Sequence, residues 1–184
     1  MDLRHKFLMA QESEVEYLTE AVLPEGFEMI SLPGHFFDMV GFRTPDDVVF
    51  LADCLSSKEI LDKYQIGVIY DVGAYIQTLE MVKSLKARLF VPSHAEATED
   101  ISSLAQYNLD KVGQIAEKIT AICKEPTCFE KILQKLFIEY GLMMNLDQYV
   151  LVGSTVRSYL SWLKDTGKVA ACFEENMLLW ETVS

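Results

Sequence analysis

The sequence predicts an α/β domain in residues 1–98, followed by a mostly helical domain in residues 99–184. Two patterns lead to this division. Up to His94, short runs of β-branched and aromatic residues alternate with stretches of helical periodicity, which is typical of a sheet covered by helices. From Glu99 onward, apolar residues recur at helical spacing until a final pair of short strands.

The composition indicates a globular protein in a reducing compartment. Half of the 184 residues are hydrophobic and 24% are charged, which is ordinary for a domain with a real core. The net charge of −12 disfavours a non-specific nucleic-acid partner, because such proteins present a basic surface. No apolar run approaches the ~20 residues of a membrane span, and the N-terminus lacks a signal-peptide pattern. The four cysteines are scattered and indicate no disulfide framework, so we expect a cytoplasmic protein. Because no segment is suited to a membrane span, we expect no membrane partner.

The first twenty residues are polar and become acidic toward their end. We expect a short strand or helix at His5–Met9 and a solvated helix at Glu12–Glu16. A domain seldom opens with so unanchored a stretch, which leaves open whether Met1 is the native start.

A β-hairpin forms the centre of the first domain. Its strands are predicted at Met39–Arg43 and Val48–Leu51, and the residues Thr44–Asp47 between them have turn chemistry. His35 lies on a tight turn before the hairpin, and Asp53 comes just past the end of the second strand. Both side chains are therefore expected on loops supported by a rigid sheet.

The other elements of the first domain follow from caps and periodicity. Serine and aspartate side chains favour helix starts because they accept hydrogen bonds from unpaired backbone N–H groups. The predicted elements are strand Phe27–Ser31, a helix capped by Ser56 or Ser57 and ending at Tyr64, strand Ile66–Tyr70, helix Val72–Leu85 capped by Asp71, and strand Arg88–Val91, which runs into Pro92, Ser93 and His94.

Three residues at strand ends have the chemistry of metal ligands. His35, Asp53 and His94 supply two imidazoles and a carboxylate, which are ligand types for zinc and similar metals. The plain alternative for each histidine is a turn residue hydrogen-bonded to backbone. Hairpin, helix and strand in alternation gather such loops at one edge of a sheet, so we expect the three residues near one another.

The motifs around these residues resemble the second half of metallo-β-lactamase-fold hydrolases. LPGH at 32–35, FLADCL at 50–55 and LFVPSHAE at 89–96 occur in the family's order, and the resemblance extends from roughly Gly26 to Glu96. It implies half of an αββα sandwich, with His35, Asp53 and His94 as ligands of zinc or another divalent metal. The chain departs from the family at Asp38 and Met39, which follow the PGH turn, and at Ala52, where the family usually has glycine.

The family's first-half signature, HxHxDH, is absent. The chain has only three histidines, His5, His35 and His94, so the remaining ligands and the group that handles the attacking water are unassigned, and the catalytic residues are unknown. Two hypotheses follow. The chain is a C-terminal fragment of a metal-dependent hydrolase and is inactive alone, or it is a non-catalytic interaction or dimerisation module built from a half-domain.

The sheet itself predicts association. Val48–Leu51 and Arg88–Val91 are continuous apolar runs, a pattern that marks strands covered on both faces. Helix Val72–Leu85 can cover only one face. We therefore expect either a homodimer or packing against a missing N-terminal half.

The second domain is predicted to contain three helices and a hairpin, which describes a winged-helix-like unit. We expect a long helix ending before Pro126, a helix started by a capping box at Thr127–Glu130 and ended by Gly141, a helix from Asn145 to Thr166–Gly167, and a hairpin of Val169–Phe173 with Met177–Val183. From Thr127 to Ser184 the sequence has five basic and seven acidic residues, and this net negative charge disfavours DNA binding. Some metallo-β-lactamase-like hydrolases carry such a unit at this end.

Three residues near the candidate ligands are open to structural roles instead of metal binding or catalysis. Asp38 is a further ligand, a carboxylate that orients a ligand, or a charge at the hairpin edge. Asp71, which follows Tyr70, is predicted to act as a helix cap. Cys54 is predicted to be a buried small hydrophobe rather than a nucleophile, because no base neighbours it in sequence.

Overall fold

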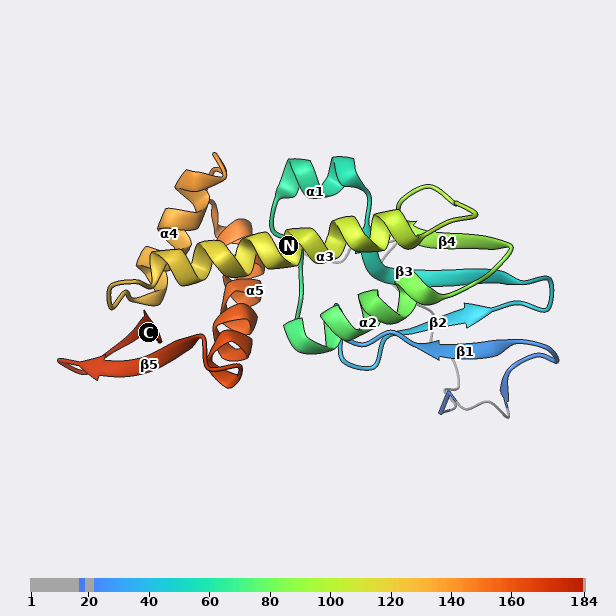
Figure 1. Cartoon of the computed structure of the whole chain (residues 1–184), viewed down its shortest axis with the longest axis horizontal. Helices are drawn as coiled ribbons and strands as arrows, with labels where there is room; N and C mark the ends of the chain where they lie inside the picture. Colours follow the sequence, from blue (N-terminus) through green and yellow to red (C-terminus); the bar gives the residue numbers. More distant parts are fainter. Residues whose placement is uncertain (1–16, 19–21, 184) are drawn as a thin grey trace, which may run out of the picture.

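The structure is a computed structural model, and it describes residues 17–18 and 22–183 (Figure 1). The elements predicted at His5–Met9 and Glu12–Glu16 lie outside these residues. The first region contains β1 (Glu28–Ser31), β2 (Val40–Arg43), β3 (Val48–Ser56), α1 (Lys58–Tyr64), α2 (Val72–Ser84) and β4 (Leu89–His94). The second contains α3 (Ser102–Ile122), α4 (Phe129–Glu139), α5 (Leu146–Asp165), β5 (Val169–Glu174) and β6 (Met177–Thr182).

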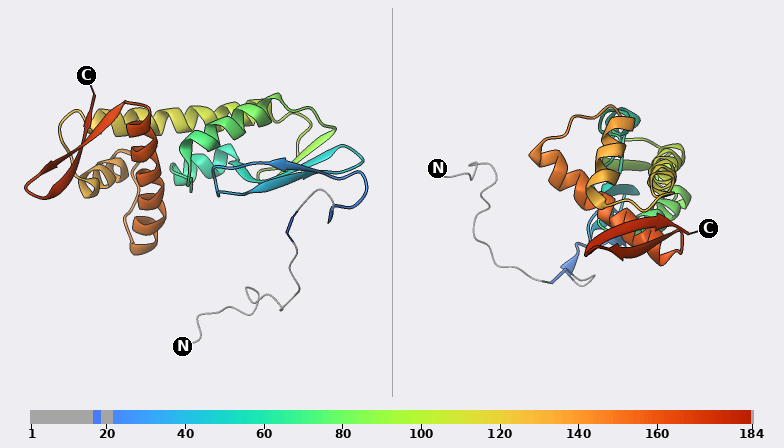
Figure 2. Two further views of the ribbon diagram at one scale, coloured as in Figure 1. Left: turned by 90° about the horizontal axis from the view of Figure 1, so that it is seen from below. Right: turned by 90° about the vertical axis from the view of Figure 1, so that its left-hand side faces the viewer.

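The first region is a four-stranded sheet in the order β1-β2-β3-β4. β1, β2 and β3 are antiparallel neighbours, whereas β4 runs parallel to β3 and is reached through the crossover helices α1 and α2. Helices α2 and α3 lie on one face of the sheet, and no described helix covers the other (Figure 2). Val49, Leu51 and Phe90 pack into the core on the covered face.

The uncovered face carries a row of apolar side chains across all four strands. Met29 pairs with Phe42, Phe42 with Phe50, and Phe50 with Val91, so the four side chains share one face. Met29, Phe42 and Val91 are half-buried and Phe50 is 45% exposed. The strands thus alternate between a packed and an open apolar face, although their sequences contain few polar positions.

Helix α3 joins the two regions. Its N-terminal part lies along α2 beside the sheet, and its C-terminal part reaches α4 and the β5–β6 hairpin (Figure 1). Its apolar residues belong to the same hydrophobic core as those of the sheet and of α4 and α5. Side chains from the helical region can therefore lie beside the sheet edge.

Several local predictions are confirmed. Ser57, Asp71 and Asn145 accept hydrogen bonds from Ile60, Ala74 and Gln148 N–H groups at the starts of α1, α2 and α5. Gly141, at φ 64°, follows α4; the N–H of Leu142 donates to the Phe137 carbonyl and that of Gly141 to the Ile138 carbonyl, as at a glycine-ended helix.

Two local predictions are wrong. Residues 66–70 form no strand, because the Ile69 N–H donates to the Thr155 hydroxyl at 3.1 Å and the Tyr70 N–H donates to the Gly34 carbonyl. The capping box at Thr127–Glu130 does not form either. The backbone of Thr127 pairs with Trp180 of β6, its hydroxyl lies against backbone carbonyls, and α4 begins after Cys128 with no side-chain cap.

Candidate metal centre

The turn that carries His35 is fixed by a glycine. The Gly34 carbonyl accepts hydrogen bonds from the N–H groups of Tyr70 and Asp71, at 2.9 and 3.0 Å. A Cβ at position 34 would lie 2.4 Å from the backbone of Tyr75, and Gly34 has φ +122°. Only glycine therefore fits this close approach to the start of α2, and the approach places His35 at the end of the sheet.

Asp53 lies inside β3, not past its end as the sequence predicts. The pairing of β3 with β4 shifts register between Phe50 and Ala52 and again between Ala52 and Ser56, and Ala52 has φ 47°. Such irregularities bend a strand and redirect its side chains. Leu51, Cys54 and Leu55 stay fully buried, whereas the Asp53 side chain is 40% exposed.

His94 ends β4. Its carbonyl accepts a hydrogen bond from the Ser57 N–H at 2.9 Å, and it pairs with Ser56 at the end of β3. The two parallel strands therefore end together, and the His94 imidazole lies beside Asp53.

The three predicted ligands converge on one carboxylate. His35 Nε2 is 3.8 Å from Asp53 Oδ2, and His94 Nε2 is 3.5 Å from Asp53 Oδ1. All three side chains are partly open to solvent, at 28%, 40% and 49% for His35, Asp53 and His94. Each imidazole thus faces a different oxygen of Asp53, a set of donors that suits a divalent cation. Among residues 17–18 and 22–183, no group of three or more His, Cys, Asp or Glu side chains is arranged to hold a metal ion as it stands.

Asp71 and Cys54, two of the neighbouring candidates, have other roles. Asp71 caps α2, with Oδ1 2.9 Å from the Ala74 N–H, and Asp38 is exposed. Burial raises the pKa of the Cys54 thiol to about 12, so this group is neutral at pH 7 and is not an activated nucleophile. Tyr70 packs against Phe36 and Phe37 in an exposed cluster beside His35, with its ring centroid 5.3 and 5.4 Å from theirs.

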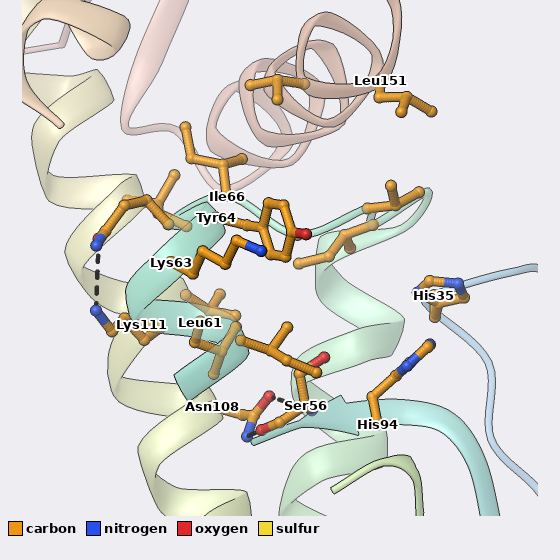
Figure 3. Close-up of a pocket in the computed structure, with 18 of the residues that line it drawn as sticks. His35, Ser56, Leu61, Lys63, Tyr64, Ile66, His94, Asn108, Lys111 and Leu151 are labelled. Atoms are coloured by element: carbon orange, nitrogen blue, oxygen red, sulfur yellow. Dashed lines mark hydrogen bonds between the residues drawn. The ribbon is translucent and has the colours of Figure 1, made fainter. Parts of the chain in front are cut away.

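A cavity of about 640 Å³ opens beside the three residues (Figure 3). Its walls come from α1, the segment 65–69, α2, α3 and α5, and most of its lining side chains are apolar. Sequence reasoning missed it entirely. The walls come from segments far apart in the chain, and each segment alone looks like an ordinary amphipathic element.

Comparison with known proteins addresses the fold. No family model and no curated protein matches this sequence. A metallo-beta-lactamase family protein from Thermus thermophilus is similar in structure, with a TM-score of 0.66 and 15% sequence identity over 85% of this chain and 49% of that one. The chain has a metallo-β-lactamase-like fold. A beta-lactamase domain protein from Burkholderia ambifaria gives a TM-score of 0.69 and 13% identity over 88% of this chain and 52% of that one.

The extent of these matches bears on both regions. The metallo-β-lactamase-like chain spans about half the length of the two solved structures. A match confined to residues 1–98 would cover at most 98 of 184 residues, well below the 85% and 88% observed. The similarity therefore extends into the helical region. No described helix has the length and apolar character needed to span a bilayer.

Proposed function

We propose that this chain is the ligand-bearing second half of a metal-dependent hydrolase of the metallo-β-lactamase superfamily, and that it is inactive alone. The observation that supports this most is the convergence of the two Nε2 atoms of His35 and His94 on opposite oxygens of Asp53, at 3.8 and 3.5 Å. His35 and His94 would donate neutral imidazole nitrogens, and Asp53 would supply the negative charge. When bound, zinc or a similar metal lowers the pKa of a coordinated water and polarises a carbonyl or phosphoryl group.

The donor set fits a metal in kind but not in arrangement. Three protein ligands are enough for a catalytic zinc when they converge on one point. Here the two imidazoles flank the Asp53 carboxylate instead, and within the described residues no group of three or more His, Cys, Asp or Glu side chains is arranged to hold a metal ion. The general base is also unassigned, so no complete catalytic cycle can be carried by these residues. An HxHxDH motif encoded in frame upstream of Met1 would supply the missing groups.

Zinc titration tests the ligand assignment directly. Because the shell is incomplete, isothermal calorimetry on the purified chain is expected to show at most one weak zinc site, which is lost in His35→Ala and Asp53→Asn. Asp38→Asn is the matched control, because Asp38 is an exposed carboxylate on the loop that carries His35 and is no part of the proposed shell. Equal zinc affinity in Asp53→Asn and Asp38→Asn would refute the assignment.

Turnover assays test the statement that the chain alone is inactive. With zinc, manganese or iron added, thioester, lactone, β-lactam and phosphodiester reporters are expected to remain intact. Hydrolysis that disappears in His35→Ala would show that the chain is a complete enzyme.

A second candidate function is a non-catalytic interaction module that forms a two-fold homodimer. The apolar row Met29–Phe42–Phe50–Val91 on the open sheet face supports it, because contiguous exposed apolar surface marks association sites. In this proposal the helical region, with its β5–β6 hairpin, is a winged-helix-like unit that packs or binds protein, not DNA. Fluorescence anisotropy with random duplex DNA at physiological salt is expected to show no micromolar binding.

A further inference from the structure

Helix α1 forms one wall of the 640 Å³ cavity, which we call its roof. Helix α1 contains no buried residue, although Ile60 and Leu61 are large and apolar, and both line the cavity. The neighbouring helices α2 and α3, by contrast, each bury a full apolar face. The apolar side of α1 therefore faces the cavity, whereas the apolar sides of α2 and α3 pack against other side chains.

Polar contacts, rather than packing, hold α1 in place. At its start, the Ser57 N–H donates to the His94 carbonyl. Midway, Asp62 accepts hydrogen bonds from the Tyr107 hydroxyl at 2.6 Å and the Lys111 ammonium at 2.9 Å, which tie the helix to α3. At its end, Gln65 has φ 61° in a strained three-residue turn closed by the Ile66 N–H and the Tyr64 carbonyl, at 2.7 Å. The cavity is thus held open under a fixed roof.

The opposite wall carries apolar side chains beside the polar residues Asn108, Lys111 and Gln148. Val112 and Ile115 come from α3, and Leu151 and Val152 from α5. The cavity lies within the usual range of about 300–1,000 Å³ for sites that enclose a small molecule. The buried Tyr159 hydroxyl belongs to this wall and has no hydrogen-bond partner within the described residues.

Charge is distributed unevenly around the cavity. His35 and His94 lie at one side, and Lys63 and Lys111 lie toward the other (Figure 3). Asp53 lies with the two histidines. Lys111 is paired with Asp62. Lys63 forms no salt bridge with any described residue, and its ammonium lies 4.8 Å from the centroid of the Tyr64 ring. Glu59, which also lines the cavity, has its pKa lowered by backbone and Ser57 hydrogen bonds, so it is already satisfied at the helix start.

We propose that this cavity binds an amphiphilic anion of the fatty-acyl type. Its apolar body packs between α1, α3 and α5, and its anionic group pairs with Lys63. As to substrate, the inference rests on the proposed hydrolase function. The compound hydrolysed would then carry its scissile carbonyl at the His35–Asp53–His94 end and its anionic group at the Lys63 end. Binding of the apolar body requires no metal.

Dodecanoate is the probe, and dodecanol is its uncharged counterpart. Calorimetry is performed with EDTA present, far below the concentration at which micelles form. The chain is expected to bind one dodecanoate, about five-fold more tightly than dodecanol, since an exposed charge pair contributes a factor of that order. Lys63→Gln is expected to remove this preference. Lys164→Gln, which changes an exposed lysine outside the cavity, is expected to keep it.

A matched pair of tryptophan substitutions locates the apolar body. Leu151 and Val150 are neighbours on α5 with similar exposure, 48% and 58%, but only Leu151 lines the cavity. Leu151→Trp is expected to weaken dodecanoate binding at least ten-fold, and Val150→Trp to leave it within two-fold. Both positions are half-exposed, so both variants are expected to fold, which circular dichroism checks.

The outcomes separate this inference from the proposed function. No binding, or equal binding by Leu151→Trp and Val150→Trp, overturns the cavity assignment whatever the zinc titration shows. An unchanged preference in Lys63→Gln overturns the anionic group. Dodecanoate binding together with no zinc site retains the ligand cavity and removes the assignment of His35, Asp53 and His94 as metal ligands.

Discussion

The two faces of the four-stranded sheet are made by the same strands, yet one face is buried and the other is open. On one face, Val49 and Leu51 are fully buried and Phe90 is 2% exposed beneath α2 and α3 (Figure 2). On the other, Phe42, Phe50 and Val91 face outward with no described layer above them, and Phe50 is 45% exposed. A sheet that faces water on one side normally alternates apolar with polar residues. This sheet is apolar on both sides, so its sequence is that of a central layer.

The largest expected effect distinguishes the two faces within one strand. Leu51→Ala is expected to lower the free energy of unfolding by about 2–5 kcal/mol, because it leaves a cavity in the packed face. Its neighbour Phe50→Ala, on the open face, is expected to cost less than about 1 kcal/mol in the monomer. Urea unfolding of both variants measures the difference. Equal losses would mean that a second layer already covers the open face.

The open face is expected to drive self-association. Phe50→Glu places a charge in the middle of the apolar row and is expected to weaken a two-fold dimer at least ~10-fold. Phe173→Glu, which alters an even more exposed phenylalanine (76%) on β5, is the control and is expected to leave the dimer intact. Sedimentation at micromolar concentration reports the result. A folded wild-type monomer that binds no hydrophobic dye would contradict the dimer.

The cover on the packed face depends on how α2 begins. Asp71→Ala removes the side-chain oxygen that accepts from the Ala74 N–H, and it is expected to cost about 1 kcal/mol. Asp71→Asn keeps an acceptor at this position and should recover most of the loss. Both values come from thermal or urea unfolding. A loss of zinc binding in Asp71→Asn would instead assign this residue to the metal centre.

The smallest effect concerns a thiol beneath the packed face. Cys54 is fully buried and its pKa is raised to about 12, whereas an ordinary thiol has a value of 9.0. Ellman's reagent at pH 8 is therefore expected to leave Cys54 unmodified in the folded chain and to react first with the partly exposed Cys128 and Cys172. Rapid modification of Cys54 would show that the covered face opens readily.

The raised pKa of Cys54 also fixes a direction with pH. Above pH 9 the unfolded chain releases this proton while the folded chain retains it up to about pH 12. The contribution of the neutral thiol to stability is thus fully present below pH 9 and is lost as the pH rises. Wild type is expected to lose stability above pH 9 faster than Cys54→Ala, as urea unfolding at increasing pH would show.

The sequence by itself determined whatever depends on neighbours within a few residues. The caps at Ser57, Asp71 and Asn145, the helix end at Gly141 and the β5–β6 hairpin were all predicted, because each rests on a hydrogen bond across a short stretch of backbone. The identity of His35, Asp53 and His94 as a group followed from their motifs. The structure brings the three side chains together, although Asp53 lies inside β3 rather than at its end.

Tertiary structure decided everything that depends on a distant partner. Residues 66–70 have the composition of a strand, but their backbone bonds to Thr155, 86 residues beyond Ile69, rather than to the sheet. Thr127 pairs with Trp180 of β6 instead of capping α4. A register shift in the pairing with β4 keeps Asp53 inside a strand and still exposes it. The cavity is the extreme case, because four helices and a loop enclose it. Its volume depends on how these elements pack, and no local pattern encodes that distance.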